Sequence, residues 1–78
     1  MKYCLRINAG DDDLARVLQA LRTRNSDFSE PPVIRSSGTK GHRAHDITLM
    51  TTESSDLSYH FFEVLLHSLL IPRYDISV

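Results

Sequence analysis

Apolar and polar side chains alternate along the beginning of the chain, where Tyr3, Leu5 and Ile7 are the apolar members. Because successive side chains of a strand leave opposite faces, this pattern predicts a strand over residues 2–8 with one buried and one solvated face. Further strands are predicted over residues 33–36, 42–52 and 73–78. The core-facing side chains of the last two strands are expected to be His45, Ile47, Leu49, Tyr74, Ile76 and Val78.

Helical spacing follows the first strand. Over residues 11–24, apolar side chains recur at intervals of three and four residues, which predicts one buried stripe along a helix. The members of this stripe are Leu14, Val17, Leu18 and Leu21. The run Asp11–Asp13 opens the segment, where aspartates can cap free N–H groups and favour the positive end of the helix dipole.

A second helix is predicted to begin within residues 53–56 and to end before Pro72. Steps of 100° per residue give it a core-facing side formed by Leu57, Phe61, Val64, Leu65 and Ser68. This helix is more apolar than one sheet-facing side requires, which indicates either contact with the first helix or an exposed surface that binds a protein partner. The predicted partner-binding surface consists of Tyr59, Phe62, Leu66 and Leu70.

The predicted elements follow one another in the order strand, helix, strand, strand, helix, strand. This order is typical of the split βαβ, ferredoxin-like sandwich. We therefore predict an α+β fold for the chain of 78 residues. It should form a single domain with a mainly antiparallel four-stranded sheet in the order 4-1-3-2 and two helices on one face.

Composition narrows the classes of function. The chain has one cysteine, Cys4, so an internal disulfide is excluded and a reducing, cytoplasmic setting is expected. Nine basic residues oppose ten acidic residues, and the resulting formal charge of −1 disfavours a general nucleic-acid binder. The longest apolar stretch, near residues 61–71, is interrupted by polar side chains and is too short to span a bilayer, so no membrane interaction is expected.

The histidines and the cysteine do not form a catalytic or metal-binding pattern. His42 and His45 would leave opposite faces of a strand, and His60 and His67 lie two turns apart on a helix. Neither pair can readily chelate one ion. Cys4 carries no sequence sign of activation by a neighbouring base. We therefore expect no enzyme activity, no metal and no cofactor.

The polar face of the sheet is expected to carry charges of both signs. Asp46 and Asp75 are predicted to pair with arginines across the strands rather than to act as an acid and base. RNA-binding domains share the predicted topology, but the third strand lacks the aromatic side chains on which bases stack. In this disfavoured alternative, the residues that would contact phosphate are Arg6, Lys40, Arg43 and Arg73.

The run Ser36–Gly41, followed by an alternating strand, a Thr-Glu-Ser-Ser helix start and a final strand, resembles the YbeD-like proteins. These are small bacterial proteins with a βαββαβ fold akin to the ACT regulatory domain. The segment Asn8-Ala9-Gly10 and the helix after it are similar to the glycine turn and first helix of an ACT domain. The resemblance implies this fold and a regulatory role. It also implies an amino-acid effector site at Asn8, Gly10 and Asp11, or between subunits.

We therefore predict a non-enzymatic protein-interaction or regulatory module that acts by binding a protein partner, with a homodimer as one arrangement. The first alternative is an ACT-type sensor of small molecules such as amino acids. Two further alternatives are a small, phage-type inhibitor of a larger complex and an RNA-binding protein.

Overall fold

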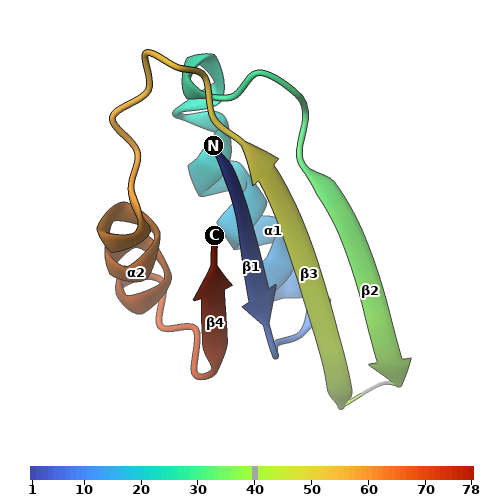
Figure 1. The fold of residues 1–78 in the computed structure, drawn as a ribbon. Coiled ribbons are helices and arrows are strands. Elements are labelled where there is room, and N and C mark those ends of the chain that lie inside the picture. Colours follow the sequence, from blue (N-terminus) through green and yellow to red (C-terminus); the bar gives the residue numbers. More distant parts are fainter. Residues whose placement is uncertain (40) are drawn as a thin grey trace.

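The computed structural model describes residues 1–39 and 41–78. Its elements are β1 (Lys2–Ile7), α1 (Asp11–Arg22), the short 3-10 helix η1 (Asn25–Asp27), β2 (Val33–Thr39), β3 (His42–Met50), α2 (Tyr59–Ser68) and β4 (Tyr74–Ser77). The strands form one sheet in the order β2-β3-β1-β4, and each neighbouring pair is antiparallel. Both helices pack on one face of this sheet (Figure 1). The predicted ferredoxin-like fold and strand order are confirmed.

The core lies between this face of the sheet and the two helices. The alternating residues of the central strands supply its floor, as predicted: Tyr3, Leu5, Ile7, His45, Ile47 and Leu49 are buried. Val17 and Leu21 of α1 are the most buried members of the predicted helical stripe. Tyr3 also packs against Phe62 of α2, with 4.9 Å between the ring centroids. The period-2 and period-3.6 patterns therefore meet in one apolar layer.

The start of α1 differs from the prediction in its capping. Gly10 is the N-cap residue, and no side chain caps the helix. Asp13 instead forms an ion pair with Arg16, one turn along the helix, at 2.9 Å. The three aspartates still lie in the first turn, where the helix dipole favours negative charge. The helix ends at Arg22, two residues before the predicted end.

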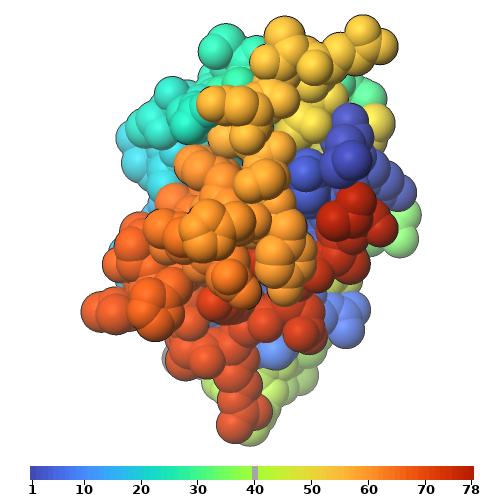
Figure 2. Space-filling model, turned by 60° about the vertical axis from the view of Figure 1, so that its left-hand side comes forward, coloured from blue at the N-terminus to red at the C-terminus, as the bar shows by residue number. Residues whose placement is uncertain are grey.

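The start of α2 is also later than predicted. Residues 53–56 form turn and coil, and Ser58 is the N-cap, with its Oγ accepting a hydrogen bond from the N–H of Phe61 at 3.4 Å. Leu57 lies before the helix and contributes to the core from this connecting segment. Figure 2 shows the side of the molecule that α2 and this segment form.

The side of α2 that packs on the core differs from the predicted side. Phe62 and Leu66 are 0% exposed, so the prediction that they belong to an outer contact surface is wrong. Val64, predicted to face the core, is exposed instead. Tyr59 and Leu70 are exposed, as the prediction required of them. The predicted side was chosen to include Leu57, which lies before the helix, whereas the buried side of the helix itself is centred on Phe62 and Leu66.

The β2–β3 hairpin is longer than predicted. Residues 37–39 pair with residues 42–44, so β2 continues to Thr39 instead of ending at residue 36 as predicted. Gly38 has a φ of +91°, and a Cβ at this position would overlap the carbonyl oxygen of His42. Glycine is therefore required at residue 38 to let the strands approach. Lys40 lies outside the described residues.

The C-terminal strand is shorter than predicted, because β4 covers Tyr74–Ser77. Val78, predicted to point inward, is exposed. Tyr74 and Ile76 are half-buried and pack against the core, in agreement with the prediction.

Among the described residues, neither helix has the length and apolar character needed to cross a membrane.

Candidate functional site

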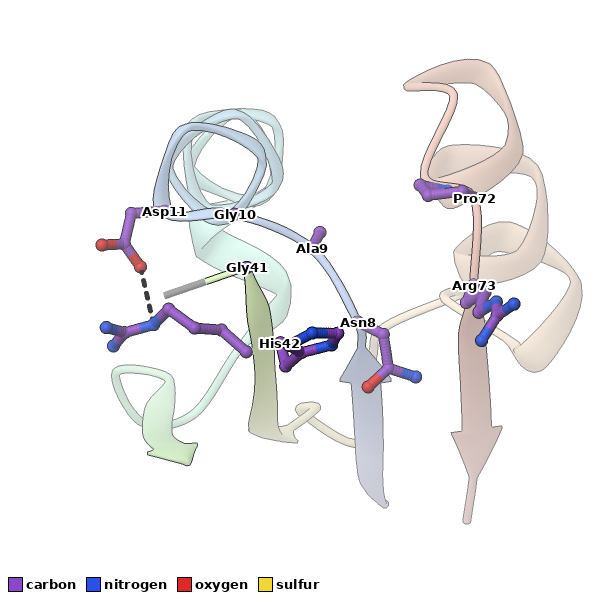
Figure 3. Close-up of a pocket in the computed structure, with 9 residues that line it drawn as sticks. Asn8, Ala9, Gly10, Asp11, Gly41, His42, Pro72 and Arg73 are labelled. Atoms are coloured by element: carbon purple, nitrogen blue, oxygen red, sulfur yellow. Dashed lines mark ion pairs between the residues drawn. The ribbon is translucent and has the colours of Figure 1, made fainter. Parts of the chain in front are cut away.

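An open hollow of about 780 Å³ lies at the end of the sheet where β1 stops and β3 and β4 begin. Because β1 runs antiparallel to both neighbours, its last residue, Ile7, pairs with Tyr74 at the start of β4 and with His45 near the start of β3. Three segments that are distant in sequence therefore meet here. The residues that line the hollow are Asn8, Ala9, Gly10, Asp11, Gly41, His42, Arg43, Pro72 and Arg73 (Figure 3).

Backbone hydrogen bonds hold the turn between β1 and α1 in place. The N–H of Asn8 donates to the carbonyl of Arg73 at 3.1 Å, which ties the turn to the start of β4. The N–H of Leu14 donates to the carbonyl of Gly10 at 3.1 Å, which ties it to the first turn of α1. A Cβ added at Gly10 would meet nothing within 4 Å, so this glycine leaves open space rather than relieving a clash.

The side of the hollow next to α1 is a small charged cluster. Arg43 Nε lies 3.2 Å from Asp11 Oδ1, and His45 Nε2 lies 3.6 Å from the same oxygen. Both nitrogens are buried and neither completes a hydrogen bond with the described residues. His45 is 0% exposed, whereas Asp11 is open to solvent. The carboxylate of Asp11 therefore satisfies the nitrogens of Arg43 and His45 only in part.

The opposite side of the hollow carries Arg73. Figure 3 shows Asp11 and Arg73 on opposite sides, with Asn8 and His42 between them. Within the part of the chain that the structure describes, the ion pairs do not include Arg73. The hollow thus has a carboxylate on one side and a solvent-exposed guanidinium on the other.

The structure brings together two sets of residues that the sequence kept apart. Asn8, Gly10 and Asp11, predicted as a small-molecule site, line the hollow. Arg43 and Arg73, predicted as candidate phosphate contacts, line it too. Lys40, a third member of that set, lies outside the described residues.

Arg6, the remaining member of the phosphate-contacting set, lies elsewhere. On the open face of the sheet it binds both carboxylate oxygens of Asp46, through Nε at 2.8 Å and Nη2 at 3.0 Å. This side-chain hydrogen bonding lowers the pKa of Asp46, and the positive charges of Arg6 and Arg35 act in the same direction. The cross-strand pairing predicted for Asp46 is confirmed. Arg6 is therefore engaged in the sheet and does not line the hollow.

The segment between α2 and β4 borders the hollow through Pro72 and carries an exposed apolar residue. Leu70 has a φ of +60° and is 81% exposed. Its N–H donates to the carbonyl of His67, and the N–H of Ile71 donates to the carbonyl of Leu66. These two bonds form a Schellman motif, in which glycine usually occupies the position held by Leu70.

The sequence did not indicate that Arg43 pairs with Asp11, or that His42 and Pro72 line the hollow. The predicted strand order was enough to show that these segments meet, because order 4-1-3-2 puts the end of the first strand near the starts of the third and fourth strands. The pairing of Arg43 with Asp11 depends on side-chain positions that strand order does not give.

In residues 1–39 and 41–78, no three His, Cys, Asp or Glu side chains are grouped so that they could hold a metal ion.

Comparison with known proteins adds no family assignment. No protein-family model matches the sequence, and no curated protein matches it. The resemblance to YbeD-like proteins therefore stays a prediction. The features that bear on function are the ferredoxin-like fold and the charged hollow at the end of its sheet.

Proposed function

We propose that this domain is a regulatory module that binds a small zwitterionic ligand of the amino-acid class in the hollow between the β1–α1 turn and the start of β4. The observation that carries the proposal is the arrangement of opposite charges across this hollow, with Asp11 on one side and Arg73 on the other. A free amino acid carries the matching pair, a carboxylate and an ammonium group.

The chemistry of the lining supports specific roles in this proposal. The Arg73 guanidinium presents several N–H donors to a ligand carboxylate, and the Asn8 amide can add another. Asp11 uses Oδ1 for Arg43 and His45, which leaves Oδ2 for a ligand ammonium group. The missing side chain at Gly10 provides space beside the turn.

A thermal-shift series with the common amino acids tests this proposal, because a ligand that binds only the folded state must raise its stability. A ligand present at a hundred times its dissociation constant stabilises the fold by about 2.7 kcal/mol. Arg73→Gln should reduce the affinity about tenfold or more, the range expected for a lost hydrogen bond to a charged group. Gly10→Leu should reduce it by filling the space.

Arg22→Gln is the matched control. Arg22 is exposed and lies at the far end of α1, outside the lining of the hollow. The substitution Arg22→Gln therefore removes the same charge as Arg73→Gln without touching the site. If no amino acid stabilises the wild-type protein at millimolar concentration, the proposal fails. It also fails if Arg22→Gln and Arg73→Gln weaken binding equally, since binding would then follow net charge alone.

A second candidate function is the binding of a protein partner, which includes self-association. The conformation and exposure of Leu70 favour it. A leucine in the left-handed region costs about 1–2 kcal/mol relative to the helical region. Leu70 bears this cost and is 81% exposed. Strained residues with large exposed apolar side chains concentrate at functional surfaces. Tyr59, also exposed and on α2, is the other remaining residue of the predicted partner-binding surface.

Sedimentation velocity of the wild type and of Leu70→Gly tests this candidate. Glycine suits the left-handed position, so the variant should be at least as stable as the wild type. The contact surface proposed here predicts a dimer at micromolar concentration that Leu70→Gly converts to a monomer. A wild-type protein that is monomeric at high concentration would remove the homodimer, and a dimer unaffected by the substitution would remove Leu70 from the contact.

A further inference from the structure

A serine, a histidine and an aspartate form a chain of contacts beside the hollow. Ser36 of β2 and His45 of β3 are cross-strand partners, and Ser36 Oγ lies 2.6 Å from His45 Nδ1. The other ring nitrogen, Nε2, lies 3.6 Å from Asp11 Oδ1. His45 is buried, whereas Ser36 and Asp11 are exposed. The imidazole is thus shielded from water while the hydroxyl remains accessible to an incoming reagent.

The position of Asp11 favours a proton on Nε2 of the His45 ring. An ionised carboxylate only accepts hydrogen bonds, so Nε2 faces it favourably only as an N–H group. A neutral imidazole then has its lone pair on Nδ1, which points at the hydroxyl of Ser36. In this tautomer Ser36 donates its hydrogen bond to Nδ1. A base that receives the hydroxyl proton and an acid that orients the base are the two requirements for an activated serine.

We propose that Ser36 is a nucleophilic acylation site, with His45 as its general base and Asp11 as the residue that positions the imidazole. An activated ester supplies the acyl group. A bond forms between Ser36 Oγ and the carbonyl carbon, and the bond from that carbon to the leaving oxygen breaks. The proton of the hydroxyl passes to His45 Nδ1 and then to the leaving oxygen, so the histidine returns to its starting state.

The geometry favours this role over a purely structural hydrogen bond. A structural histidine in a core normally satisfies both ring nitrogens, but His45 Nε2 has no hydrogen-bond partner among the described residues. Its separation from Asp11 is a little too long for a hydrogen bond, as is common for catalytic contacts before a substrate is bound. Arg43 lies on the same carboxylate oxygen and keeps it close to the ring.

Reaction with p-nitrophenyl acetate tests the proposal directly. Release of p-nitrophenolate gives the rate, and mass spectrometry of peptides gives the site. We expect a single acetyl group on Ser36 of the folded protein. Ser37→Ala is the matched control, because Ser37 is the neighbouring exposed serine, pairs with Ala44 and has its side chain on the other face of the sheet. Ser36→Ala should abolish the fast acetylation, and Ser37→Ala should leave it unchanged.

Asp11 is tested without disturbing the core, since its side chain is exposed. Asp11→Asn should slow acetylation of Ser36 about tenfold or more, a loss within the range of general-base catalysis. Asp11→Glu should restore most of the rate, and the pH dependence of the rate should change in Asp11→Asn. A merely structural role would change the melting temperature of these variants without changing that pH dependence.

Two results would overturn the proposal. One is acetylation of Ser36 no faster than that of Ser37 in the folded protein, or no faster than in the protein unfolded in urea. The other is acetylation of Ser36 that is unaffected in Asp11→Asn. Neither measurement contains an amino-acid ligand, so failure here leaves the proposed function of the hollow standing, and failure of ligand binding leaves this test intact.

Discussion

The open face of the sheet and the hollow at its end both carry charged side chains, but they differ in how completely those charges are paired. On the open face, Arg35, Asp46, Arg6 and Asp75 occupy one row across all four strands. Positive and negative residues alternate along this row. Its central pair is bidentate, with both oxygens of the carboxylate bound at hydrogen-bonding distance. The charges there serve strand pairing.

At the hollow the same kinds of group are left incomplete. One oxygen of Asp11 faces both Arg43 and His45, and the two buried nitrogens of these residues make no hydrogen bond with the described residues. Arg73, across the hollow, is exposed to solvent. Unsatisfied donors and an exposed cation gathered in a concave site are the features expected where a ligand or a reagent supplies the missing partner. The difference separates charged groups that pair with one another across the sheet from groups that are available to bind a ligand or a reagent.

The largest effect is expected from Gly38, because the hairpin that carries Arg43 and His45 depends on it. Gly38→Ala forces a left-handed φ on a residue with a Cβ and pushes that Cβ into the backbone of His42. The variant should lose about 3 kcal/mol of stability in urea unfolding, the upper part of the range for backbone strain. Gly10→Ala is the control, since its φ is −73° and its Cβ would have free space. Equal stabilities of the two variants would contradict this.

Substitution of His45 should change the stability in the opposite direction to Gly38→Ala. His45→Leu removes a buried nitrogen that has no hydrogen-bond partner and keeps an apolar side chain in the core. Removing an unsatisfied buried polar group can raise stability by about 1 kcal/mol, although the hydrogen bond to Ser36 is lost. A gain or no change in the free energy of unfolding would confirm that the polar groups of His45 do not stabilise the fold. A loss of several kcal/mol would show that the hydrogen bond between His45 and Ser36 is needed to stabilise the fold.

The sequence was sufficient for the fold because the two periodic patterns are strong where the core is formed. Alternation at Tyr3, Leu5 and Ile7 requires one buried face, and the spacing of Val17 and Leu21 provides the helix that covers it. The start of α2 was not determined in the same way. Several serines and aspartates precede it, and their capping strengths are similar, so local preference does not select Ser58.

The candidate site was predicted only in fragments. Asn8, Gly10 and Asp11 came from the family resemblance, and Arg73 from its charge. Their meeting follows from strand order, but the contact between Ser36 and His45 depends on the register of β2 against β3. A strand predicted to end at residue 36 leaves that register open, and a shift of one residue would place the serine on the other face.

The pair on the open face should contribute modestly. Asp46→Asn removes a partly exposed ion pair, and such pairs are usually worth little in water. We expect the melting temperature to fall by less than about 4 °C at low salt. The difference from wild type should shrink as the ionic strength rises, because salt screens exposed charges. Asp75→Asn is the matched control, since Asp75 pairs with Arg6 in the same row but, among the described residues, forms no ion pair with it.

The smallest effect, the pH dependence of the same pair, has a definite sign. Hydrogen bonding from Arg6 lowers the pKa of Asp46 in the folded protein. The unfolded chain therefore binds more protons at Asp46 than the folded chain does between the two pKa values, and stability rises with pH there. The contribution is complete above the ordinary aspartate pKa of about 3.9 and is lost as the pH falls through the lower, folded value. In urea unfolding from pH 7 to pH 2, the difference between wild type and Asp46→Asn should be constant down to about pH 5 and should shrink below it. A difference that grows on acidification would mean that the carboxylate of Asp46 is not stabilised by Arg6, and the open face would then be no better paired than the hollow.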